Sequence, residues 1–247
     1  MKQDKFMEEV KEIIKADILK KVLPRLIPER DIKQDKSILV HRFLDLGIIY
    51  EIKIENVSFV ILHEMLEDLN ISAEEVQFAA IANMKKQAKI QTMREILSEH
   101  FLETEVSPQK ESSAEMYVVS AGDDLITGKL SNGAAAILSR SIRKQIVKRM
   151  GGNAYLLPSS IEEFIVCPEI KGEEKELLKM VYSINHSDII PDSLFLSNSI
   201  YYLEENGDLY PTHGLAPLCM IAGINRKDRI KYLTSFSSKS AGMLQRI

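Results

Sequence analysis

Residues 151–169 read GGNAYLLPSSIEEFIVCPE, and this stretch does most to decide the fold. The glycine pair at its start is typical of a helix end, because glycine readily adopts the left-handed conformation of a C-terminal cap. Short apolar runs at Ala154–Leu157 and Phe164–Cys167 predict two strands with a turn between them. A helix that stops before two consecutive strands indicates an α+β protein.

Outward from this stretch, the second half of the chain is predicted to have the order β-β-α-β-β-α-β. Asn206-Gly207 is a typical hairpin turn after the last of these strands and leads to a short return strand at Leu209-Tyr210. The strands are expected at Met116–Ser120, Ala134–Leu138, Ala154–Leu157, Phe164–Cys167 and Ser199–Leu203, and the helices at about 139–150 and Glu173–Ile184.

The first half begins with an amphipathic helix over about Lys2–Val22. Its apolar residues recur at three- and four-residue steps and so share one face: Phe6, Val10, Ile13, Ile14 and Ile18. Two β-rich runs follow at Leu46–Ile54 and Ser58–Leu62. Ser72 with Glu75 three residues later is a capping box, which predicts the start of a long helix. A second helical piece is expected over about Gln91–His100.

Residues 104–115 read TEVSPQKESSAE and have no periodic apolar pattern, so they predict a linker. We therefore expect an N-terminal half at residues 1–110, a C-terminal half at 115–210 and a basic tail at 211–247. The predicted class is α+β. The first half would hold the N-terminal helix and a β-β-α-α order, and sheets and helices would pack in two layers.

Several segments resemble a bacterial family known only as domain of unknown function 5688. They span most of His41–Glu205 and include LPSSIEE, in the stretch quoted first, and NGAAAIL at Asn132–Leu138. The resemblance implies one architecture over this span and no particular chemistry. The N-terminal helix matches that family loosely, and the tail from Pro211 does not resemble it.

Composition points to an ordinary folded protein, with 45% hydrophobic and 28% charged residues. Two cysteines form no disulfide framework, the N-terminus lacks a signal-peptide core, and no run has the roughly 18 apolar residues of a spanning helix. We therefore expect a cytoplasmic protein without a membrane segment. The net charge is −4, but residues 211–247 carry +5 and the rest −9.

Catalytic and cofactor motifs fail on spacing. Gly122 to Lys129 resembles a phosphate-binding loop, but five residues separate its glycines where four are needed, and Leu130 replaces the metal-binding Ser or Thr. His63-Glu64 begins like a zinc-protease helix, but Glu67 stands where the second histidine belongs. The sequence therefore predicts no cofactor and no metal, and it leans away from an enzyme.

Two sets of polar residues remain as candidate sites. Ser159, Ser160, His186 and Asp188 lie at strand ends and loops, where they could converge on a small molecule. Glu162 and Glu163 follow the two serines by three residues, so helix capping is the competing interpretation. A basic helix could bind an anion or nucleic acid, although a solvated face is favoured; its candidate residues are Arg140, Arg143, Lys144 and Lys148.

The absence of catalytic signatures favours a non-catalytic binding or regulatory protein. It would act through contact with an unidentified protein or through self-association, and the positive tail offers one means of docking on an acidic surface. A small-molecule enzyme using the serine and histidine set is the first alternative. Nucleic-acid binding through the basic helix is the second.

Overall fold

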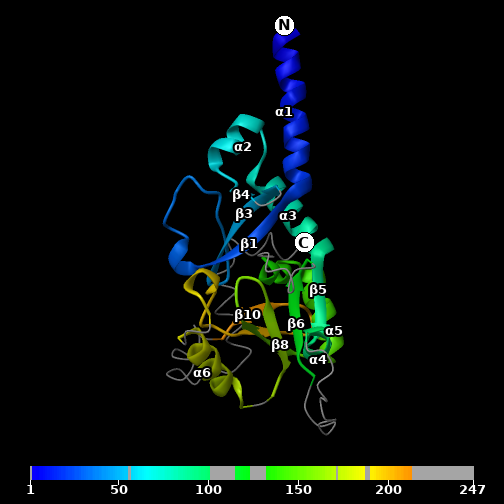
Figure 1. Ribbon diagram of the computed structural model, residues 1–247, viewed down its shortest axis with the longest axis vertical. Coiled ribbons are helices and arrows are strands. Elements are labelled where there is room, and N and C mark those ends of the chain that lie inside the picture. The colour runs from blue at the N-terminus through cyan, green and yellow to red at the C-terminus, as the bar shows by residue number, and fades with distance from the viewer. Residues whose placement is uncertain are drawn as a thin grey trace. The chain divides into compact units, whose positions relative to one another are not determined.

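The computed structural model describes residues 2–54, 57–100, 115–122, 132–170, 172–186 and 190–212. The chain divides into two compact units, Met1–Gln87 and Ala88–Ile247. Each unit combines helices with an open antiparallel sheet, so the predicted α+β class is confirmed (Figure 1).

The first unit is built around one central strand. Strand β3 pairs with β1 along one edge, while β2 and β4 pair with the two ends of its other edge. The elements are α1 (Lys2–Lys21), β1 (Val22–Pro28), the 3-10 helix η1 (Glu29–Asp31), β2 (His41–Phe43), β3 (Leu46–Ile54), β4 (Val57–Val60), α2 (His63–Leu69) and α3 (Ala73–Gln87).

Strand β1 was not predicted, because Pro24 and Pro28 were interpreted only as signals that end the preceding helix. The strand tolerates both prolines because it pairs with β3 alone, so the missing donors can face away from the ladder. The capping box before α3 is confirmed. The amide of Ser72 donates to Glu75 Oε2 over 2.8 Å, and the amide of Glu75 donates to Ser72 Oγ over 3.1 Å.

The core of the first unit joins alternate residues of the sheet to one side of α3. Val22, Ile48 and Tyr50 are fully buried, and so are Val76 and Ala80 of the helix. The C-terminal part of α1 is anchored to the same core. Its Ile18 is buried, and the side-chain amide of Asn83 donates to the carbonyls of Leu19 and Val22 over 2.9 and 3.0 Å.

His41 is hydrogen-bonded to a side chain of this core. The hydroxyl of the buried Tyr50 lies 2.8 Å from Nδ1 of His41, and the two rings pack edge to face. Burial lowers the pKa of His41, nearby Glu74 opposes that shift and His63 adds to it. The folded state therefore holds this imidazole in its neutral form more strongly than the unfolded chain does.

The free energy of unfolding is expected to fall as the pH is lowered through the ordinary histidine pKa of about 6.5. In this window the unfolded chain binds more protons than the folded one, because the pKa of His41 is lowered in the fold. Denaturant titrations at about pH 7.5 and pH 5.5 should show that His41→Phe flattens this dependence. The exposed His63→Phe removes only the smaller contribution of His63 to this pKa and should keep most of the pH dependence. A pH dependence as steep in His41→Phe as in the unaltered protein would contradict the assignment.

The second unit is a six-stranded antiparallel sheet in the order β10-β9-β7-β8-β6-β5. Figure 1 shows β6 and β8 running through it, with α6 to one side. The elements are β5 (Ala88–Thr92), α4 (Met93–His100), β6 (Tyr117–Ala121), η2 (Gly133–Leu138), α5 (Arg140–Met150), β7 (Ala154–Pro158), β8 (Phe164–Pro168), α6 (Glu174–Asn185), η3 (Asp192–Leu194), β9 (Tyr201–Leu203) and β10 (Leu209–Pro211).

Different helices pack on the two faces of this sheet. Tyr155, Leu157 and Cys167 form a cluster with Val181 of α6 on one face. On the other face, η2 packs against β6, and α5 packs against η2. The predicted strand at Ala134–Leu138 is wrong: this segment is the 3-10 helix η2, and all its residues are buried. A short, wholly apolar run has no periodicity that separates a strand from a buried helix.

The unit boundary lies earlier in the chain than the predicted linker. Strand β5 pairs with β6 over Ala88–Thr92, so the ladder places these residues in the second unit. The predicted linker at residues 104–115 falls outside the described residues except for Glu115. The predicted tail at residues 211–247 lies outside the described residues after Thr212.

Candidate functional site

The serine pair lies in the turn that joins β7 to β8. Residues 159–163 form no helix, so the interpretation of these serines as helix caps is wrong. Ser160 Oγ instead accepts a hydrogen bond from the amide of Glu162 over 3.0 Å, and the amide of Ile161 donates to the carbonyl of Leu194 over 3.0 Å. The hydroxyl of Ser160 is thus used to shape a tight hairpin turn.

Glu163 is a carboxyl of this turn whose pKa is shifted. Burial raises its pKa, and a hydrogen bond with Ser159 partly offsets the rise. A partly buried carboxyl beside a hydroxyl is a recognised setting for acid–base chemistry, although structural turns use the same pairing. It is the strongest chemical feature that the structure adds to the predicted set.

The other members of the predicted set contribute less. His186 follows the last residue of α6, where its ring stacks on Tyr182 and its Nδ1 donates to the Tyr182 carbonyl over 2.8 Å. Asn185 beside it donates to the carbonyl of Ser197 and to Oδ1 of Asn198. No hydrogen bond among the described residues joins His186 to either serine, and Asp188 lies outside those residues.

The turn is nevertheless the place where two of the most distinctive sequence segments meet. The amide of Ala134 in NGAAAIL donates to the carbonyl of Ile161 in LPSSIEE over 3.3 Å. At Gly133, a Cβ atom would lie 2.3 Å from the carbonyl oxygen of Glu162 and 2.5 Å from the amide nitrogen of Ala121. Both segments are therefore needed to join η2 to the sheet.

The basic helix α5 uses its two leading arginines inside the fold. Arg143 is buried, and its guanidinium donates to the carbonyls of Gly207, Ile137 and Leu138 over 2.7, 2.7 and 3.1 Å. Arg140 pairs with Asp208 over 3.1 Å. These contacts hold the hairpin between β9 and β10 against the helix.

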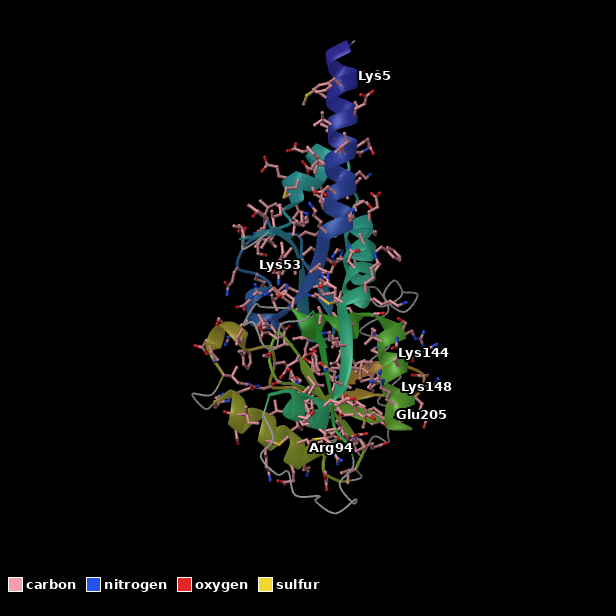
Figure 2. The ribbon with its side chains drawn as sticks, turned by 45° about the vertical axis from the view of Figure 1, so that its right-hand side comes forward. Lys5, Lys53, Arg94, Lys144, Lys148 and Glu205 are labelled. Carbon is pink, nitrogen blue, oxygen red and sulfur yellow. The ribbon has the colours of Figure 1, made fainter. Side chains whose placement is uncertain are left out.

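The two lysines of the predicted anion-binding set are exposed. Figure 2 shows Lys144 and Lys148 on the outer side of α5. Burial, together with the nearby charge of Arg140, lowers the pKa of Arg143 to about 10, so it remains charged at neutral pH while its donors are occupied. Anion binding by this helix therefore depends on the lysines and stays a prediction.

The clearest unpartnered surface in the first unit belongs to α1. Phe6 is 63% exposed and Ile13 is 69% exposed, and Met7 and Ile14 are exposed as well. The apolar stripe, defined as Phe6, Met7, Val10, Ile13 and Ile14, occupies the half of α1 that extends beyond the other elements of its unit (Figure 1). The three-to-four periodicity of these residues was visible in the sequence. It predicts one shared face, and of that predicted set only Ile18 is buried.

The described ranges hold neither a metal-ligand cluster nor a membrane-spanning helix. No three His, Cys, Asp or Glu side chains there lie close enough together to hold a metal ion. No helix in the same ranges has the length and apolar character required to cross a bilayer.

Comparison with known proteins identifies two matching families. The family of unknown function DUF5688 matches residues 3–205, which confirms the resemblance found in the sequence and extends it toward the N-terminus. The C-terminal domain of glycosyl hydrolase 109 matches residues 196–247. No solved structure matches the chain.

The curated relatives share only a short segment with this chain. An alpha-N-acetylgalactosaminidase of Bacteroides fragilis is 53% identical over 45 residues, which are 18% of this chain and 11% of the relative. A glycosyl hydrolase family 109 protein 2 of Shewanella sp. strain ANA-3 is 57% identical over 42 residues, 17% of this chain and 9% of the relative. The chain thus spans about a tenth of the length of the curated relatives it matches.

Proposed function

The chain belongs to the family of unknown function DUF5688, and from that premise we propose that it is a non-catalytic binding protein that associates with itself through the apolar stripe of α1. The observation that carries this proposal is the exposure of Phe6 and Ile13, at 63% and 69%, on a helix with a buried anchor at Ile18. An anchored helix that presents a bare apolar face is suited to pairing with another helix.

Covering the apolar stripe stabilises a helix pair because it removes large apolar side chains from water. Full burial of a large apolar side chain contributes about 1.5–3 kcal/mol relative to its exposed state. A helix pair that covers Phe6 and Ile13 on both copies gains this term four times, from which the entropy of association is subtracted. The opposite side of α1 carries the charged residues Lys5 and Glu12, both exposed, so water solvates it without a partner.

The test is the sedimentation-derived mass of the full chain, whose monomer has 28.0 kDa, as a function of concentration. We expect the mass to rise toward that of a dimer for the unaltered protein. The double substitution Phe6→Ser with Ile13→Ser should keep it at the monomer value. The matched control Lys5→Ser with Glu12→Ser has the same seven-residue spacing on the charged side and should dimerise normally. A monomer at every concentration would overturn the proposal.

A second candidate function is favoured by the C-terminal match. The relatives named as glycosyl hydrolases support an action on carbohydrate, and an α-linked N-acetylgalactosaminide is the substrate that the name of the Bacteroides fragilis relative specifies. Release of nitrophenol from p-nitrophenyl α-N-acetylgalactosaminide by the purified full chain would support this candidate. No release above that of a chain ending at Thr212 would remove it.

The serine turn keeps a place as the alternative catalytic site, with Ser159, Ser160 and the partly buried carboxyl of Glu163 as its members. Docking of the positive tail on an acidic surface also stays a prediction. Deletion of residues 213–247 should change the oligomeric state, taken as the sedimentation-derived mass relative to that of the shortened monomer, if the tail takes part in association. An unchanged oligomeric state would assign association to α1 alone.

A further inference from the structure

The distribution of charge along α1 differs between its two halves. Residues 2–10 carry a formal charge of −1 and residues 11–21 carry +2. The apolar stripe spans residues 6–14 and so crosses the point at which the sign changes. Lys15 is paired with Glu75 of its own unit, so a net +1 of the second half remains to face the −1 of a partner's first half.

We propose that two copies of α1 pair in an antiparallel orientation, so that the acidic half of each helix lies against the basic half of the other. This inference rests on the proposed self-association and specifies its geometry. A parallel pair would place like net charges beside each other in both halves, which is unfavourable. Antiparallel alignment also brings the positive N-terminal end of each helix dipole to the negative C-terminal end of its neighbour.

The spacing of the stripe defines one antiparallel register. Phe6, Val10 and Ile13 follow the four- and three-residue steps of a helix-pairing seam, which continues to Asp17. When Val10 of one copy lies opposite Ile13 of the other, Met7 lies opposite Ile14, and every aliphatic member of the stripe meets another. Phe6 then faces Asp17, whose carboxylate is already paired with Lys21 over 2.7 Å.

The attachment of α1 to its own unit leaves this face open. Lys15 points the other way, where its ammonium donates to the carbonyl of Asn70 over 3.1 Å and lies 3.2 Å from a carboxylate oxygen of Glu75. Ile18, four residues after Ile14, is buried and marks the C-terminal end of the open part of this face. Asp17 and Ala16 on the outer side are exposed, so a second helix can lie along the full seam. Figure 2 shows Lys5 near the far end of α1, beyond the other elements of the first unit.

The register places Glu9 of one copy beside Ala16 of the other, at the margin of the seam. Both residues are exposed and neither belongs to the stripe, so cysteine substitution at either position should leave the fold and the apolar seam intact, while Glu9→Cys changes residues 2–10 from −1 to 0 in one of the two chains. In a parallel pair these two positions are seven residues apart, which is about 10 Å along the helix axis. That separation exceeds the reach of a disulfide.

The experiment mixes full chains of two lengths, one carrying Glu9→Cys and the other, with a purification tag, carrying Ala16→Cys. Both carry Cys219→Ser; Cys167 is buried, which raises its pKa to about 11 and keeps it unreactive. After mild oxidation, the mixed disulfide should exceed either like-with-like disulfide by about tenfold, because only the mixed pair fits the required geometry.

Two outcomes separate this inference from the proposal beneath it. Equal amounts of mixed and like-with-like disulfides, in a protein that sediments as a dimer, would overturn the antiparallel register and leave self-association standing. A protein that sediments as a monomer would overturn both. Adding Phe6→Ser with Ile13→Ser to the two cysteine chains should abolish the mixed disulfide, which shows that the bond reports on the stripe.

Discussion

Replacement of Gly133 by alanine is expected to lower the free energy of unfolding of the second unit by about 3–5 kcal/mol. The new Cβ would lie 2.3 Å from the carbonyl oxygen of Glu162, 2.5 Å from the amide nitrogen of Ala121 and 2.8 Å from the carbonyl carbon of Ser120. All three are backbone atoms, so no side-chain rotation relieves the contact. Either η2 or the β7–β8 turn must move, and the buried residues of η2 move with it.

The matched control is Gly152→Ala, in the same unit. There the nearest atom to a new Cβ is Oε1 of Glu205 at 3.7 Å, which is ordinary contact with a flexible side chain. The control should change the free energy of unfolding by less than about 0.5 kcal/mol in a denaturant titration followed by circular dichroism. A Gly133→Ala protein as stable as this control would show that η2 does not approach the sheet as closely as described.

Arg143→Met is the second large effect, with an expected loss of about 3–5 kcal/mol. The methionine fills much of the volume but leaves the carbonyls of Gly207, Ile137 and Leu138 without their guanidinium donor. A buried acceptor that loses its hydrogen bond costs about 1–3 kcal/mol, and the hairpin between β9 and β10 loses its attachment to α5.

Lys148→Met is the control for this change, because it lies on the same helix and is exposed (Figure 2). It should alter the free energy of unfolding by less than about 0.5 kcal/mol. Thermal unfolding of both variants gives the comparison directly. A loss below about 1 kcal/mol for Arg143→Met would mean that water satisfies the three carbonyls and that the arginine is available to a ligand.

Elements with a strong local signal were predicted well from the sequence. The strands at Ala154–Leu157 and Phe164–Cys167, the glycine cap at Gly151 and the hairpin after β9 all occur. In that hairpin the turn is longer than two residues. Oδ1 of Asn206 accepts a hydrogen bond from the amide of Asp208, while Gly207 takes the positive φ of 86° that favours glycine.

The errors have a common physical origin in contacts that are distant in sequence. Strand β1 forms despite two prolines because it pairs with the edge of β3. The segment η2 is a 3-10 helix because the backbone of β6 and of the β7–β8 turn surrounds Gly133. Neither of these contacts can be predicted from the local sequence pattern. The boundary between the units was displaced for the same reason, since β5 joins the second unit by pairing with β6 across a long intervening segment.

The candidate sites show the same limit. The basic residues of α5 share a face in sequence, but the hairpin that covers Arg140 and Arg143 arrives from more than 60 residues away. The apolar residues of α1 also share a face, and their helical period was correctly recognised. Whether such a face is buried depends on the element that packs against it, and the first unit covers only its C-terminal end.

The most direct measurement of the central claim is amide hydrogen exchange over residues 5–17 as a function of protein concentration. An unpartnered helix half exchanges quickly because its turns open without loss of packing. Protection of this segment is expected to rise steeply as the protein is concentrated, while protection of α3 stays constant. Protection that is the same at every concentration would contradict self-association through α1.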